Sequence, residues 1–147
     1  MFKKIIYIFI VFELITLKVF TKENFFQEAK NLFDKGKIEE SKFLFQRNIV
    51  FNPKDSKSYL YLAKIYESEE NELEEEKNIN TTLLLEPDNE EAMYMLIDMK
   101  LEKSDISKVK ELREKFEIIC KSLCSKVDSI DARLSDIDVK NESWCKS

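Results

Sequence analysis

The chain has 147 residues and a net charge of −5, and it contains one glycine, two prolines and no histidine. A chain of this length has room for one modest domain, and so few turn residues exclude a many-stranded sheet, so an all-α fold is predicted. The acidic balance disfavours nucleic-acid binding. Ser-His-Asp triads and imidazole metal sites need histidine, and phosphate-binding loops need several glycines. We therefore predict no enzyme activity, no cofactor and no metal site.

The first residues of the chain have the pattern of an export signal. Lys3 and Lys4 precede an apolar stretch at residues 5–12, and a positively charged segment before an apolar one is how a secretory signal begins. We therefore predict that residues 1–21 are a signal peptide and that the mature protein is exported, either to a periplasm or outside the cell.

Two other interpretations of this segment stay open. In one, residues 5–20 are an uncleaved membrane anchor; in the other, they form a core helix of the fold. Glu13 and Lys18 interrupt the apolar run, and charges are costly inside a bilayer, which argues against a permanent transmembrane helix. The best cleavage site, at residues 19–21, is far from the usual Ala-x-Ala pattern.

The spacing of apolar positions beyond residue 22 follows the 3.6-residue period of a helix. It predicts helices at residues 23–34, 38–51, 56–69, 72–85, 90–103, 106–121 and 125–136. Asp55 and Asn89 are good N-caps for two of them. The polar tail at residues 138–147 is predicted to be disordered.

Equivalent residues recur along these helices. Pro53 and Pro87 lie 34 positions apart, and residues at equal distances before each proline are alike in kind. The pairs are Ala29 and Ala63, Leu32 and Tyr66, Phe45 and Ile79, and Ile49 and Leu83. Small alanines let two helices approach closely, and the larger side chains fill the space around that contact. Gly36 lies where a turn is needed, and each proline lies where a helix must stop.

This pattern resembles the tetratricopeptide repeat family, in its small exported bacterial form, over residues 22 to 123. The resemblance implies a short right-handed α-solenoid of helix-turn-helix repeats at residues 22–137. Its units are expected at residues 22–55, 56–89 and 90–123, with a C-terminal capping helix at residues 124–137.

Three residues depart from the family pattern. Glu28 stands where the first helix usually has leucine, and Glu75 stands where the second helix usually has a small residue. Lys121 stands where a third proline would fall. A degenerate third unit is expected, because a terminal repeat must cap the stack.

The resemblance also implies a concave groove lined by the first helix of each unit. The residues it places there are Phe26, Lys30, Phe33, Lys57, Tyr61, Lys64, Tyr94 and Asp98. Lysines beside aromatic rings suit an extended or helical peptide with acidic residues. The Lys and Asn set that clamps a C-terminal carboxylate in chaperone-binding members is not reproduced.

The expected function is therefore a non-catalytic protein–protein interaction module, an exported scaffold or adaptor that binds a protein or peptide partner. The alternative is a structural protein that self-associates, or that is tethered to a membrane through residues 5–20, with no peptide groove in use.

An acidic run at residues 67–76 contains seven glutamates. Such runs are usually exposed and mutually repelling, so we interpret this one as a solvated turn and helix start. The alternatives are a patch for a basic partner or for a divalent cation. A calcium site would need oxygen ligands converging from a loop with glycine at its bend, and that pattern is missing.

Cys120 and Cys124 are four residues apart. On a continuous helix their Cβ atoms would lie about 5–6 Å apart, which is wider than the roughly 3.5–4.5 Å of a relaxed disulfide. A bridge therefore requires the helix to end between them. Our hypothesis is that it does, and that the oxidised pair closes the C-terminal cap, as an exported location would allow. The alternative is two half-buried thiols; Cys145 has no partner in this scheme.

Overall fold

The computed structural model describes residues 25–144, with side chains as far as residue 137. Within these residues there are seven helices and no strand, which confirms the all-α prediction. They are α2 (Phe25–Asp34), α3 (Ile38–Phe51), α4 (Ser56–Ser68), α5 (Glu72–Leu85), α6 (Glu90–Glu102), α7 (Ile106–Ile119) and α8 (Lys126–Trp144). The segment predicted to be a signal peptide or anchor lies outside the described residues.

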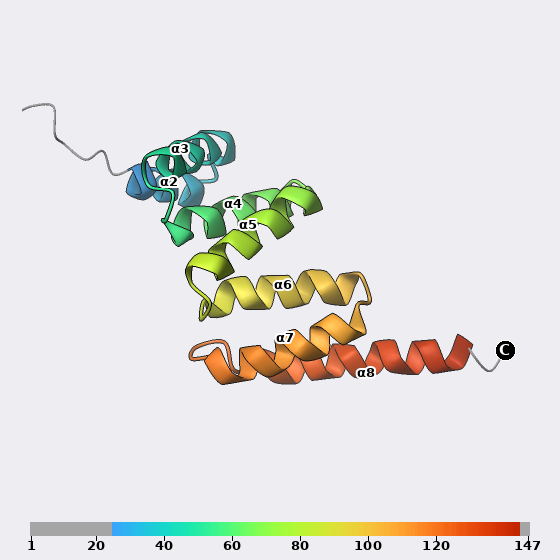
Figure 1. Cartoon of the computed structure of the whole chain (residues 1–147). Coiled ribbons are helices and arrows are strands. Elements are labelled where there is room, and N and C mark those ends of the chain that lie inside the picture. Colours follow the sequence, from blue (N-terminus) through green and yellow to red (C-terminus); the bar gives the residue numbers. More distant parts are fainter. Residues whose placement is uncertain (1–24, 145–147) are drawn as a thin grey trace, which may run out of the picture.

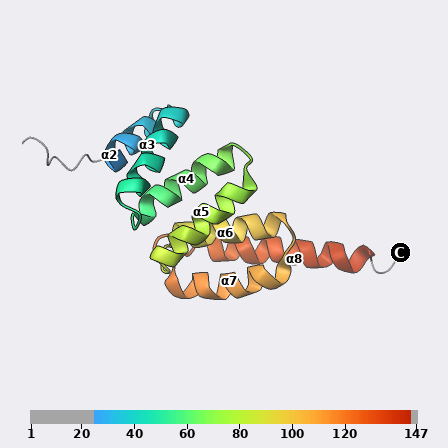
Figure 2. The ribbon, with the colours of Figure 1, turned by 45° about the horizontal axis from the view of Figure 1, so that its top comes forward.

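The helices form hairpins that stack in chain order (Figure 1). α2 pairs with α3, α4 with α5, and α6 with α7, and each second helix also contacts the first helix of the next hairpin. α8 packs against both α6 and α7 and ends the stack, as Figure 2 shows from a second direction. The predicted α-solenoid of paired helices with a capping helix is confirmed.

The turn inside each hairpin has the same backbone geometry. Its residue with positive φ is Gly36, then Glu70, then Ser104, with φ angles of 74°, 56° and 53°, and these residues lie at intervals of 34 positions. The bonds that close the turns run from Lys37 N–H to Leu32 O, from Asn71 N–H to Tyr66 O and from Asp105 N–H to Lys100 O, at 2.9, 2.9 and 3.0 Å. Each satisfies a carbonyl that the helix end leaves unpaired. The third hairpin thus repeats the turn of the first two, although it lacks the proline.

The two predicted N-caps behave differently. The Asn89 side chain accepts a hydrogen bond from the Ala92 N–H at 2.9 Å and caps α6. The Asp55 side chain accepts no hydrogen bond from a backbone N–H of α4. Its carboxylate accepts instead from the Asn48 side-chain amide at 2.7 Å and from the Ser58 hydroxyl. Asn48 is buried and needs an acceptor, because an unmet buried amide is costly. This side-chain network therefore ties α3 to α4.

The apolar core consists of two clusters that share α4. Leu62 and Ile65 pack with Ala29 and Phe45 of the first hairpin. Leu60 and Ala63, on other sides of the same helix, belong to a larger cluster that extends through the third hairpin to Ile130 and Leu134 of α8. Each hairpin thus covers apolar surface that its predecessor leaves open. Glu28, the first departure from the family pattern, is exposed on α2.

The C-terminal boundaries differ from the prediction. α7 ends at Ile119 instead of residue 121, and α8 continues to Trp144 instead of residue 136. The tail predicted to be disordered from residue 138 is therefore helical as far as Trp144. No glycine or proline interrupts residues 126–144, so the polar composition of this segment does not stop the helix. Among the described helices, none has the length and apolarity that a membrane span requires.

Candidate functional site

Four aromatic side chains from three helices form an aromatic cluster: Phe26 and Phe33 of α2, Phe45 of α3 and Tyr61 of α4. The Tyr61 ring stacks on Phe45 with centroids 5.0 Å apart, and it meets Phe33 and Phe26 edge to face at 5.2 and 5.8 Å. Phe45 is fully buried, whereas the other three rings are half-buried. The cluster is therefore both the core of the first hairpin and part of its surface, because its outer rings still face solvent.

Two of the predicted groove lysines stand beside this cluster and are already paired. Lys64 forms an ion pair with Glu91 at 2.7 Å, and its Nζ lies 4.8 Å from the centroid of the Tyr61 ring. Lys30 is bonded to Asp34 at 2.6 Å, and this bond together with the Tyr61 hydroxyl raises the pKa of Lys30. The chain's own carboxylates thus offset part of the positive charge expected in the groove.

The remaining predicted residues are placed apart from the cluster. Lys57 is exposed on α4, one turn before Tyr61. Tyr94 and Asp98 of α6 are approached by α8: the Arg133 guanidinium donates to Asp98, and the Lys126 Nζ lies 5.1 Å from the centroid of the Tyr94 ring. The capping helix therefore covers part of the face that the third unit was expected to give to the groove.

Sequence reasoning missed an acidic cavity at the other end of α4. The cavity has a volume of about 330 Å³ and is lined by Glu67, Glu70, Glu72, Glu75, Met95, Asp98, Met99 and Glu102. Its walls are the end of α4, the turn, the start of α5 and the facing side of α6. Two signals pointed to it: the acidic run, and the departure from the family pattern at Glu75. Neither shows that α6 brings further carboxylates to the same place.

The carboxylates of this acidic cavity raise one another's pKa. Burial raises the pKa of Glu75 to about 7, and the negative charges of Glu67, Glu102 and Glu72 add to the rise, while Lys103 opposes it. Partial burial also raises the pKa of Glu67, and the negative charges of Asp98 and Glu102 add to the rise. Within the part of the chain that the structure describes, no three cysteine or carboxylate side chains converge closely enough to hold a metal ion.

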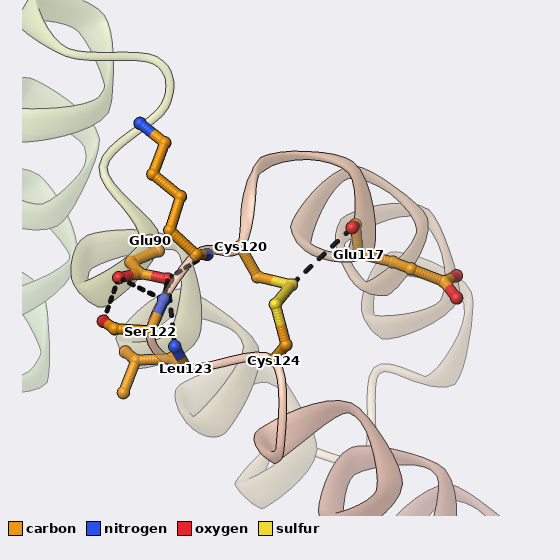
Figure 3. The surroundings of a disulfide bond; sticks show 7 residues. Glu90, Glu117, Cys120, Ser122, Leu123 and Cys124 are labelled. Carbon is orange, nitrogen blue, oxygen red and sulfur yellow. Dashed lines mark hydrogen bonds between the residues drawn. A yellow bond between two sulfur atoms is a disulfide. The ribbon is translucent and has the colours of Figure 1, made fainter.

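The loop between α7 and α8 carries the cysteine pair (Figure 3). α7 ends at Ile119, so the helix does not run through both cysteines, and the Cys120 and Cys124 sulfur atoms are bonded. The same loop turns the N–H groups of Lys121, Ser122 and Leu123 toward the Glu90 carboxylate, with N···O distances of 2.7 to 3.2 Å. These bonds lower the pKa of Glu90 to about 2, and the bond from the Lys121 N–H has the largest effect. The loop is thus fixed to the start of α6.

The stacked hairpins, the repeated turn and the capping helix define a class of protein: a short tetratricopeptide-like solenoid. No protein-family model matches the chain, and no curated protein is similar to it in sequence. Solved structures are similar in fold. SycD, a type III secretion chaperone of Yersinia enterocolitica, in complex with a peptide of the translocator YopD, has a TM-score of 0.69 at 15% identity, covering 82% of this chain and 95% of that chain.

Two further structures show the same similarity of fold. PcrH in complex with the chaperone binding region of PopD has a TM-score of 0.66 at 13% identity, over 82% of this chain and 93% of that chain. The second TPR domain of human RPAP3, in complex with an HSP70 peptide, has a TM-score of 0.61 at 18% identity, over 76% and 90%. At such identities the likeness establishes the fold alone.

Proposed function

We propose that this protein is a non-catalytic interaction module that binds a peptide segment of a partner protein against the first helices of its repeats. The observation that carries the proposal is the aromatic cluster, in which Phe26, Phe33 and Tyr61 keep part of their surface in solvent beside Lys64. Rigid aromatic rings with an adjacent cation are typical anchors of peptide recognition. The similar solved structures hold peptides or chaperone-binding regions of other proteins, which supports the same use of the fold here.

A selection from a displayed library of random peptides on the full chain tests this proposal. We expect enriched peptides with a shared motif, and we expect Tyr61→Ala and Lys64→Glu each to weaken their binding by roughly tenfold or more, the scale of a hot-spot residue. Leu84→Ala is the matched control, because Leu84 is 80% exposed on α5, a second helix. Unfolding midpoints of all variants separate lost contact from lost fold. If no peptide is enriched, or if the groove variants bind like the control, the proposal is wrong.

The proposal includes an exported location, in a periplasm or outside the cell. The charged and then apolar start of the chain supports it, and so does a cysteine pair placed to form a disulfide, since such bonds persist in oxidising compartments. N-terminal sequencing of the mature protein and thiol counting by mass spectrometry without reductant test both parts. We expect a new N-terminus near residue 21 and no free thiol at Cys120 or Cys124. An intact N-terminus in the membrane fraction would favour the anchor at residues 5–20 instead.

A further inference from the structure

The acidic cavity next to the groove suggests what kind of residue the partner brings, and this inference rests on the proposed function. We propose that the acidic cavity receives one lysine or arginine side chain of the bound partner, whose positive charge the cavity's unpaired carboxylates neutralise. The cavity adjoins the aromatic cluster along α4, since Glu67 lies one turn beyond Lys64 and two turns beyond Tyr61. A peptide anchored on the rings therefore passes close to the mouth of the cavity.

Glu75 is the residue that distinguishes a binding cavity from an ordinary acidic surface. Only 9% of its surface is exposed, it lines the cavity, and it makes no hydrogen bond or ion pair with any side chain in the described residues. One repeat earlier the equivalent residue is Ser41, which is fully buried between helices. A small residue suffices for packing at this position. Glu75 therefore places in the cavity wall a carboxyl group that no side chain of the described residues pairs with, and a ligand cation would supply the missing positive charge.

The cations of the protein do not neutralise all of the carboxylates that line the cavity. Among the six carboxylates that line the cavity, Glu72 pairs with Lys103 at 2.9 Å and Asp98 pairs with Arg133. The other four are Glu67, Glu70, Glu75 and Glu102, and none forms an ion pair with the cations of the described residues. A cation entering the cavity therefore meets a net negative field. Electrostatic attraction is strongest near the buried Glu75, and water screens it near the exposed Glu67, Glu70 and Glu102.

The remaining walls favour a long side chain over a bare metal ion. Met95 and Met99 supply apolar surface beside the carboxylates, and thioether side chains adapt to the methylene stem of a lysine or arginine. The carboxylates are spread over the cavity, and they do not converge as metal ligands do. A volume of about 330 Å³ accommodates one such side chain with a few waters.

Methyl NMR of the methionines in the full chain gives a direct test, with N-acetyl-lysine N-methylamide as the probe. We expect the Met95 and Met99 methyl signals to shift saturably. Met93 is buried and does not line the cavity, so its signal is expected to stay unchanged. N-acetyl-norleucine N-methylamide, which lacks the charge, is expected to cause no such shift. Calcium is titrated separately, and a saturable response to calcium without a response to the lysine probe overturns the proposal.

Two variants localise the effect. Glu75→Ser copies the residue of the first repeat, and Glu102→Gln changes an exposed residue at the end of α6. Glu75→Ser is expected to weaken probe binding by roughly tenfold, because it removes a buried charge partner. Glu102→Gln is expected to weaken it by about two- to fivefold, because water screens an exposed carboxylate. Full binding by both variants contradicts the proposal, and Glu102→Gln keeps the test valid if Glu75→Ser does not fold.

The pH dependence of probe binding provides an independent readout. The groups that face Glu75 are Glu67 from α4, Glu72 from α5, and Asp98, Glu102 and Lys103 from α6 or its end. Since the pKa of Glu75 is about 7, binding of the cation is expected to strengthen as pH rises from about 6 to about 8. Glu75→Ser is expected to flatten this dependence, and a steep dependence in that variant counts against Glu75.

The outcomes also separate this inference from the proposed function. If the library yields groove-binding peptides whose lysines and arginines can be replaced by glutamine without loss, the groove function stands and the cavity inference is wrong. If the lysine probe binds the cavity but no peptide binds the aromatic cluster, the cavity inference stands and the proposed function is wrong.

Discussion

Glu75 shows how a single residue can depart from the repeat and change its surroundings. Three neighbouring carboxylates and its own burial hold its pKa at about 7, above the ordinary value of 4.5. The folded protein therefore keeps a proton on Glu75 over a range in which the unfolded chain has released it. Alignment of the repeats identified Glu75 as a departure from the pattern. It did not show that Glu102 of α6, which is distant in sequence, lies close to it.

The free energy of unfolding is expected to fall as pH rises from about 4.5 to about 7 through this residue, because the native state binds more protons there. The shift sets an upper limit of ~3.5 kcal/mol on the loss, at ~1.4 kcal/mol per pKa unit. Glu75→Gln removes this contribution, so its stability relative to the wild type is expected to be greater at about pH 8 than at about pH 5. Urea unfolding at both values measures the difference. Glu114→Gln, an exposed change on α7, is the control, and parallel pH curves for wild type and Glu75→Gln would contradict the expectation.

At the scale of the element, the hairpin turn recurs in backbone geometry without recurring in sequence. Only the first hairpin uses glycine at the residue with positive φ, while Glu70 and Ser104 adopt the same conformation with side chains. Glycine adopts this conformation freely, whereas other residues pay roughly 1 kcal/mol or more. The residue types at the third turn therefore did not predict its backbone conformation. The missing proline also suggested a more degenerate third unit than the structure has.

Ser104→Gly is expected to stabilise the protein by ~1 kcal/mol, because it relieves the positive φ at an exposed position. Gly36→Ala is expected to destabilise it by a similar amount, since a Cβ at Gly36 meets no neighbouring atom and only the backbone conformation opposes it. Thermal or urea unfolding measures both changes. Ser104→Ala leaves a Cβ in place and is expected to have little effect, so an equal gain from alanine and glycine would rule out the backbone explanation.

At the scale of the whole molecule, the capping helix completes the stack. α8 buries Ile130 and Leu134 in the larger apolar cluster, and Arg133 pairs with Asp98 of α6. The helical period of the sequence predicted the helices, and the resemblance built on the 34-residue repeat predicted their pairing and the order of the stack. Neither predicted the length of α8, whose polar composition looks like a tail, or the acidic cavity, whose walls meet only in the folded chain.

Leu134→Ala is expected to destabilise the protein by about 2–4 kcal/mol, the cost of removing a buried leucine side chain and leaving a cavity. The loss arises because α8 covers the last hairpin, so the change should lower the urea midpoint without removing helical structure at low urea. Ser135→Ala, on the exposed side of the same helix, is the control. Equal midpoints for the two variants would show that α8 does not hold the stack together.

The sharing of α4 between two apolar clusters has a consequence for shortened forms of the protein. A fragment that begins after α3 would keep the larger cluster intact but would leave Leu62 and Ile65 without the side chains of Ala29 and Phe45 that cover them. Such a fragment would expose apolar surface along α4, and exposed apolar surface of this kind promotes association between molecules. The first hairpin therefore keeps these apolar side chains of α4 out of solvent.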